Sequence, residues 1–207
     1  MSQKRPDSPI RAEITDINRE FLHLLTHPHL NGAADHLGLD QGTLECLRGL
    51  SSEELDAIAA APVLLMEFSP SQAGAADPRQ LEQKVADEAY GTVWQRELTG
   101  YANRLLTFVW QTARRDQGLS SLHLGLEPNQ AQQLAQLSFA RISRNGATAA
   151  SYLRARLCWH PSFWSDLIRA VRSGNPEQQL ASLLAVIQLS VACPRPIARR
   201  SIEQGYC

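Results

Sequence analysis

Apolar residues recur at helical spacing through most of the chain, whereas alternating runs typical of strands are scarce. Near the N-terminus, Ile14, Ile17, Phe21, Leu24 and Leu25 fall on one stripe of an amphipathic helix. We therefore expect an all-α protein with no sheet of consequence.

Residues that start helices support the same fold class. Asp40 is a suitable N-cap, and Ser51 with Glu54 has the spacing of a capping box, in which each residue satisfies the backbone of the other. A long helix is expected within residues 79–115, and Asn175 precedes another helical segment.

The tetrapeptide His-Leu-Gly-Leu occurs twice, at positions 36–39 and 123–126, which are 87 residues apart. Leu-x-x-Leu-Ser follows at the same distance each time, at 47–51 and 134–138. Three interpretations compete: coincidence in a leucine-rich chain, a DNA-reading turn used twice, or a duplicated domain. The aligned residues are a turn glycine, core leucines and a capping serine, so we favour a duplicated multi-helix unit.

A single small unit cannot bury all of its apolar faces, so we expect two similar units packed as an internal pseudo-dimer. The segment 70–78 is rich in Ser, Gly, Ala and Pro and is expected to be a linker. The expected organisation is a disordered arm at 1–12, a first unit at 13–69, that linker, a second unit at 79–192 with a long connecting helix and a C-terminal helix, and a basic tail at 193–207.

Charge is unevenly distributed along the chain. Residues 1–99 contain 8 Lys and Arg against 16 Asp and Glu, whereas residues 100–207 contain 12 Arg, no Lys and 5 acidic residues. The two halves are therefore expected to face different partners or each other.

The first copy resembles FlhD, the helical subunit of the bacterial FlhD–FlhC flagellar master regulator. The similarity runs without gaps from Leu37 to Phe68 and involves about a quarter of the chain directly. The matching positions are Asp16, Ile17, Asn18, Leu37, Gly38, Leu39, Leu47, Leu50, Ser51, Leu55, Ile58, Ala59, Leu64 and Phe68.

The resemblance implies an all-α transcriptional regulator or co-regulator that acts on promoter DNA together with an FlhC-like subunit. Members of this family form dimers, and the partner carries much of the DNA contact. This chain departs from the pattern in having two copies and a shorter spacing between Asn18 and Leu37. The family cysteine that links two subunits falls on Met66, so that disulfide cannot form, and self-association is left open.

Both copies also have the pattern of a helix-turn-helix, which is used either to read DNA or only for packing. The second copy is the better candidate for reading DNA bases, because its exposed positions are neutral amides, which can bind adenine edges. Arginines of the C-terminal half are candidates for phosphate contacts. The candidate DNA-binding residues are Asn129, Gln130, Gln133, Arg141, Arg144, Arg154, Arg156, Arg195, Arg199 and Arg200.

Trp159, Phe163 and Trp164 are either a core cluster or an exposed anchor for a partner protein. The chain contains no nucleophile elbow, phosphate loop or dinucleotide fingerprint, so we expect neither an enzyme nor a cofactor or metal site. Four scattered cysteines and no apolar leader or membrane-length run indicate a cytoplasmic protein. The alternative function is a protein–protein interaction adaptor with no direct DNA contact.

Overall fold

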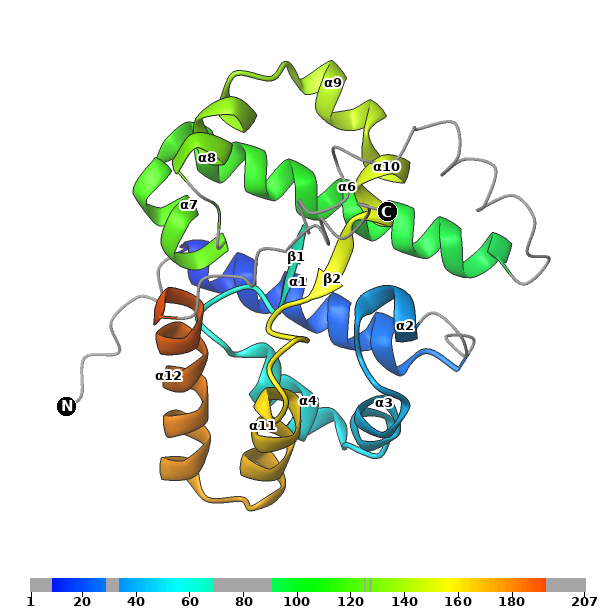
Figure 1. Ribbon diagram of the computed structural model, residues 1–207, viewed down its shortest axis with the longest axis vertical. Coiled ribbons are helices and arrows are strands. Elements are labelled where there is room, and N and C mark those ends of the chain that lie inside the picture. The colour runs from blue at the N-terminus through cyan, green and yellow to red at the C-terminus, as the bar shows by residue number, and fades with distance from the viewer. Residues whose placement is uncertain (1–8, 29–33, 69–90, 125, 127, 193–207) are drawn as a thin grey trace, which may run out of the picture.

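The computed structural model describes residues 9–28, 34–68, 91–124, 126 and 128–192. Its regular structure is mostly helical, which confirms the expected helical character of the chain (Figure 1). One feature differs from the expectation: two three-residue strands pair to form a small sheet.

The first part of the chain forms four helices and one strand in the described residues. Their order is α1 (Pro9–Thr26), α2 (Ala34–Leu37), α3 (Gln41–Arg48), α4 (Ser52–Ala59) and β1 (Met66–Phe68).

The second part begins, in the described residues, with a long helix and ends with a helical hairpin. Its elements are α6 (Gly91–Arg115), α7 (Gln117–Leu124), α8 (Pro128–Ala135), α9 (Phe139–Arg144), α10 (Gly146–Ser151), β2 (Leu153–Ala155), α11 (Phe163–Arg172) and α12 (Pro176–Ala192).

Side-chain caps fix the start of two helices as the sequence predicts. The Asp40 carboxylate accepts a hydrogen bond from the Thr43 backbone N–H at 2.8 Å. Ser51 and Glu54 form the complete capping box at the start of α4. Each cap satisfies N–H groups that have no partner inside the helix, so the chain turns at defined residues.

α1 and α6 contact each other in the middle of the molecule (Figure 1). Their closest aromatic contact is the stack of Phe21 on Tyr101, with ring centroids 6.0 Å apart. α8, α9 and α10 pack on α6, while α3 and α4 pack on α1. Most of the buried side chains form one hydrophobic cluster, which does not include Ala131 of α8 or Ile142 of α9.

β1 and β2 pair antiparallel across the two parts of the chain. Met66 lies opposite Ala155, Glu67 opposite Arg154, and Phe68 opposite Leu153. Both strands are too short to be stable alone, so each depends on the other and on the helices that cover them.

Asn18 fixes the irregular segment that connects α4 to β1. It lies fully buried on α1, and its Nδ2 donates to the carbonyl oxygens of Ala59, Ala61 and Val63 at 3.2, 3.4 and 2.9 Å. Its Oδ1 accepts the backbone N–H of Leu65 at 2.9 Å. Buried backbone groups need such partners, so a single side chain stabilises the approach to β1.

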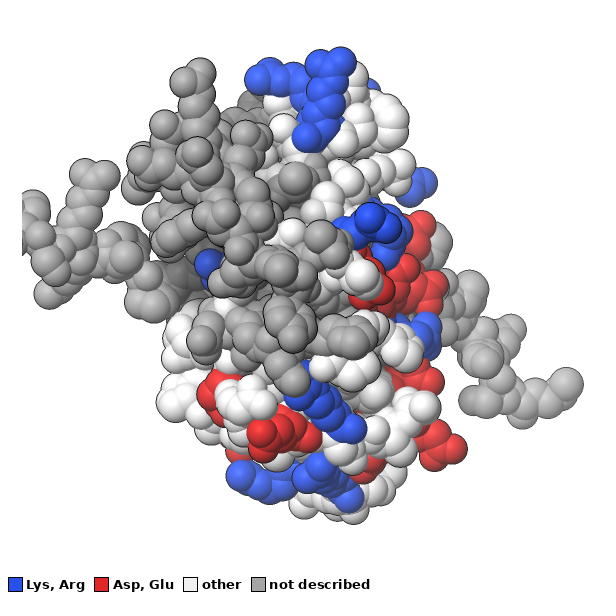
Figure 2. All heavy atoms as spheres, turned by 90° about the vertical axis from the view of Figure 1, so that its right-hand side faces the viewer, with Lys and Arg blue, Asp and Glu red and all other residues white. Residues whose placement is uncertain are grey.

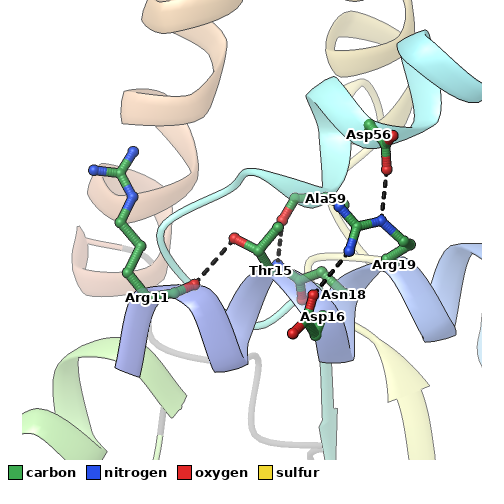
Figure 3. Close-up of polar contacts among 7 residues, drawn as sticks. All are labelled: Arg11, Thr15, Asp16, Asn18, Arg19, Asp56 and Ala59. Atoms are coloured by element: carbon green, nitrogen blue, oxygen red, sulfur yellow. Dashed lines mark hydrogen bonds and ion pairs between the residues drawn. The ribbon is translucent and has the colours of Figure 1, made fainter. Parts of the chain in front are cut away.

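On the surface of the same helix, Arg19 bridges Asp16 and Asp56 at 2.8 and 2.6 Å, which ties α1 to α4 (Figure 3). The pKa of Arg19 is raised, mainly by its hydrogen bond to Asp56. All three side chains are exposed, so this network contributes little free energy compared with Asn18 beneath it.

We predict that Asn18→Ala lowers the free energy of unfolding by about 3 kcal/mol, because several buried backbone groups lose their partner. Asn103→Ala is the matched control on α6, since the Asn103 Oδ1 has no hydrogen-bond partner. The control should change stability by less than about 0.5 kcal/mol. Urea denaturation measures both, and equal losses in the two variants would contradict the role given to Asn18.

Candidate nucleic-acid interface

The predicted DNA-reading positions of the second helix-turn-helix lie on α8. Asn129 and Gln133 are exposed, whereas Gln130 is half-buried. The structure therefore brings two of the three amide side chains to the surface, where a carboxamide can reach a base edge.

α9, the next helix along the chain after α8, carries positive charge. Arg141 and Arg144 are both exposed and stand three residues apart, so they lie on neighbouring positions of one helix face. The chain has no Asp or Glu between residues 128 and 165. Figure 2 shows arginine and neutral side chains at the end of the molecule that α9 occupies in Figure 1. We call the exposed residues Asn129, Gln133, Arg141 and Arg144 the α8–α9 face.

Aromatic contacts that the sequence analysis missed hold α9 against α6. The Trp110 Nε1–H donates to the carbonyl of Leu137 at 3.0 Å, just before α9 begins. Its ring lies 5.9 Å from Phe139 and 5.0 Å from the Arg114 guanidinium. Trp110 is buried and Phe139 is 58% exposed. The buried Trp110 ring therefore packs beneath the exposed Phe139 ring of α9. The pairing joins residues far apart in sequence, and no local spacing indicates it.

The corresponding surface of the first part is acidic. Residues 40–59 contain five acidic residues and one arginine, whereas residues 127–146, which lie 87 positions later, contain one acidic residue and two arginines. Phosphate repulsion disfavours DNA contact by the first segment. α3 and α4 also contact α11, so part of their surface is occupied by the chain itself.

Arg154 and Arg156 do not join the α8–α9 face. Arg156 is only 2% exposed, and its Nε lies 4.0 Å from the Glu67 carboxylate, so its prediction as a phosphate contact is wrong. Arg154 is half-buried and donates to the Leu153 carbonyl at 2.8 Å. Burial lowers the pKa of Arg154. Arg156 therefore lies against Glu67 of β1, whereas Arg154 donates to carbonyls of its own segment.

The remaining predicted arginines, Arg195, Arg199 and Arg200, lie outside the described residues, as do most of the proposed N-terminal arm and the linker at 70–78. Their contribution to DNA contact stays a prediction.

The aromatic cluster after β2 is mainly core. Phe163 and Trp164 are 5% and 4% exposed and pack edge to face, so of the two interpretations the core cluster holds for them and the exposed anchor does not. The Trp164 indole donates to the Arg156 carbonyl at 3.0 Å, which satisfies its polar end inside the protein. Trp159 is 38% exposed and contacts His160, so it alone of the three presents an aromatic surface.

A cleft separates α3 from α11. It has a volume of about 510 Å³ and adjoins a smaller hollow of about 180 Å³ that reaches Cys158 and His160. Asp40 lines both, and its pKa is lowered chiefly by the hydrogen bond from the Thr43 side chain. This carboxylate is used as the cap of α3 and stays ionised, so it is a poor general acid.

Gly38 lies at the turn between α2 and α3, where Cys158 packs against it. Its φ is +77°, in the left-handed region that favours glycine. A Cβ at this position would lie 2.8 Å from the Cys158 Sγ. The turn glycine predicted from the sequence is therefore required both by backbone conformation and by the close approach of the segment after β2.

The histidines of the two His-Leu-Gly-Leu motifs each bind a carbonyl in the other part of the chain. His36 Nε2 is 3.1 Å from the Ala150 oxygen, and His123 Nδ1 is 2.8 Å from the Pro62 oxygen. Burial lowers the pKa of His36, with a smaller contribution from Arg154, so the neutral ring is favoured in the folded protein. These contacts explain why His belongs to the repeat.

No family model matches the chain, and neither curated proteins nor solved structures provide a match. In the described ranges, no helix combines the length and apolar character needed to cross a bilayer. Those same ranges hold no group of three or more His, Cys, Asp or Glu side chains placed to bind a metal ion.

We predict that protonation of His36 destabilises the folded protein at mildly acidic pH. Its folded pKa is lowered while the unfolded value stays near 6.5, so this contribution to stability is present above about pH 6.5 and is lost as pH falls from there through the folded pKa. One such group changes the unfolding free energy by at most about 1.4 kcal/mol per pH unit.

Urea denaturation between pH 5 and 7.5 tests this prediction. His36→Gln removes the titration and should flatten the dependence of stability on pH, whereas the exposed His23→Gln should leave the wild-type slope unchanged. A wild-type slope in His36→Gln would rule out this residue as the source.

A second prediction concerns Gly38. Gly38→Ala should destabilise the fold by more than about 2 kcal/mol, because it adds the cost of a left-handed alanine to the clash with Cys158. Gly174→Ala is the control: its φ is +64°, but a Cβ there meets nothing within 4 Å. Thermal and urea unfolding should show the larger loss in Gly38→Ala, and Cys158→Ala should partly rescue it; equal losses without rescue would discount the Cys158 contact.

Proposed function

We propose that this chain is an internally duplicated, FlhD-like co-regulator of transcription, in which the second unit contacts double-stranded DNA beside an FlhC-like partner. The observation that carries the DNA part is the α8–α9 face, an exposed surface of amides and arginines in a segment free of acidic residues from 128 to 165. Arginine binds phosphate, and Asn or Gln can read adenine.

The proposed duplication is supported by elements that recur at a gapless offset of 87 residues. α3 and α8 have matching bounds at this offset, and so do β1 and β2. Five of the six buried positions of α1 are also buried in α6 at the same offset, and the sixth, Leu24, corresponds to the exposed Gln111. The pairs are Ile14 with Tyr101, Asn18 with Leu105, Phe21 with Phe108, Leu22 with Val109, and Leu25 with Thr112.

The strand register supports an internal pseudo-dimer. Glu67 and Arg154 lie opposite each other and are themselves 87 residues apart, so the centre of the pair joins equivalent positions. The flanking pairs are Met66 with Ala155 and Phe68 with Leu153. The 87-residue offset relates Met66 to Leu153 and Phe68 to Ala155, so it converts one flanking pair into the other. A two-fold axis through the centre of an antiparallel strand pair relates the residues in this way. The same arrangement occurs in an isologous dimer, where equivalent residues meet at the axis. The carbonyl contacts of His36 and His123, each to the opposite part, are nearly reciprocal.

The two units would then divide their tasks. α11 contacts α3 and α4 of the first unit, whereas the main contacts of α8 and α9 in the described residues are with α6, α7 and α10 of their own unit. The face of the first unit is acidic and partly covered, and its counterpart in the second unit carries exposed arginines. This difference favours the second unit as the surface nearest to DNA.

An interaction adaptor without DNA contact is the second candidate. The specific observation that favours it is the exposure of large apolar side chains away from the α8–α9 face, among them Trp159 at 38%. The two candidates differ in whether the chain contributes its own phosphate contacts, which salt dependence measures directly.

The test is a titration of promoter-length DNA at several salt concentrations, with the chain alone and with an FlhC-like subunit added. A co-regulator with its own contacts should increase the affinity of the partner and steepen its salt dependence. If addition of the chain leaves both quantities unchanged, the adaptor interpretation is favoured.

We predict that the double variant Arg141→Ala/Arg144→Ala weakens DNA binding of this complex at least tenfold and reduces the salt slope by about two, because up to two phosphate contacts are lost. The control is Arg11→Ala/Arg169→Ala, which removes the same charge from exposed positions on α1 and α11. Fluorescence anisotropy measures both, and equal weakening in the control would attribute the effect to net charge rather than to the α8–α9 face.

A further inference from the structure

α12 is unusually apolar for a helix at the surface. Between Pro176 and Ala192 its only ionisable side chain is Glu177, in the first turn. Surface helices normally show a charged face opposite the buried one, and α12 has none.

One side of α12 packs inward. It contacts α11, and Val186 is fully buried while Leu183 and Ile187 are partly buried against the core. The opposite side presents Leu180 and Leu184, which are 59% and 48% exposed and stand one helical turn apart. Ala181 is exposed beside them and is small enough to let another helix approach closely.

We propose that this outer stripe of α12 is a self-association surface, on which a second copy of the chain packs its own α12 in antiparallel orientation. Each α11–α12 hairpin would contribute two helices to a four-helix arrangement, in which the exposed leucines become core residues. The inference does not rest on DNA binding, and α12 lies apart from α9 in the fold (Figure 1).

The charge and symmetry of α12 select a second copy as the occupant. Leu184 is the middle residue of the helix, with eight residues on each side, so an antiparallel pair crossing there overlaps along its whole length. The two Glu177 carboxylates then lie at opposite ends, about 20 Å apart along the axis, where they are screened. A parallel pair would bring them together.

Other occupants fit this stripe less well. A partner recognised through charge finds no lysine or arginine on α12 and only one acidic residue. A lipid surface normally binds a helix that has basic residues on its polar face, and α12 lacks them. A neutral apolar helix of the same kind is the best match, and the chain itself supplies one.

Sedimentation velocity of the full-length chain over a wide concentration range tests the proposal. The wild-type mass should rise from that of the 22.9 kDa chain towards twice that value. Leu184→Glu should weaken association at least tenfold, because two carboxylates would meet at the axis. Gln178→Glu is the control, since it adds the same charge to an exposed position of α12 outside the leucine stripe.

Charge reversal gives a second readout that a folding defect cannot imitate. Leu184→Lys should also be monomeric, but an equal mixture of Leu184→Glu and Leu184→Lys chains should associate again, because residue 184 faces its own copy. Circular dichroism should show wild-type helix content in each variant. A wild-type chain that stays monomeric, or a Leu184→Glu chain that associates like wild type, overturns the proposal, as does a mixture that fails to associate.

Discussion

The pairing of β1 with β2 is the constraint on which the arrangement of the two parts depends. A three-residue strand cannot be stable on its own, so β1 is defined only when β2 lies beside it. The residue before β1 is held from two sides. Asn18 of α1 accepts the Leu65 N–H, and the Arg156 N–H, just after β2, donates to the Leu65 carbonyl at 2.8 Å. Residues from α1, β1 and β2 are therefore stabilised together, and buried side chains of all three belong to one hydrophobic cluster.

The same helical framework carries two different surfaces. α3 begins with an ionised Asp40, lies in an acidic segment and contacts α11. α8 lies 87 residues later and presents Asn129 and Gln133, and its own residues include no Asp or Glu. Core positions of the two segments are apolar while their exposed positions differ. Under the proposed duplication, this is expected when one copy is fixed by intramolecular packing and the other is free to acquire a binding surface.

Local signals in the sequence predicted local structure well. The capping box at Ser51, the helix that follows Asn175 and the turn at Gly38 were all predicted and are present, because each depends on residues within a few positions of one another. Burial was harder to predict. Arg156 and Trp164 are residue types of a basic or aromatic binding surface, yet both are buried, and the Trp164 indole donates to the Arg156 carbonyl.

The small sheet could not be predicted for a similar reason. Three residues are too few to show the alternation that identifies a strand, and Met66–Phe68 pairs only with a segment almost ninety residues away. The 87-residue repeat contained the missing information, since it places residues 66–68 and 153–155 at equivalent positions. The repeat is visible in the sequence through its core leucines, whereas residues 66–68 and 153–155 share no residue type that would mark them as strands.

The charges at the centre of the strand pair explain how one chain could select this pairing. If two identical first units associated in the same way, Glu67 would lie opposite Glu67, and two second units would place Arg154 opposite Arg154. Like charges directly across an antiparallel pair are destabilising, whereas opposite charges contribute about 0.2–1 kcal/mol. In this chain Glu67 lies opposite Arg154, and its carboxylate is also close to the buried Arg156. Under the proposed duplication, divergence at this one symmetric position favours the pairing of first with second unit over either self-pairing.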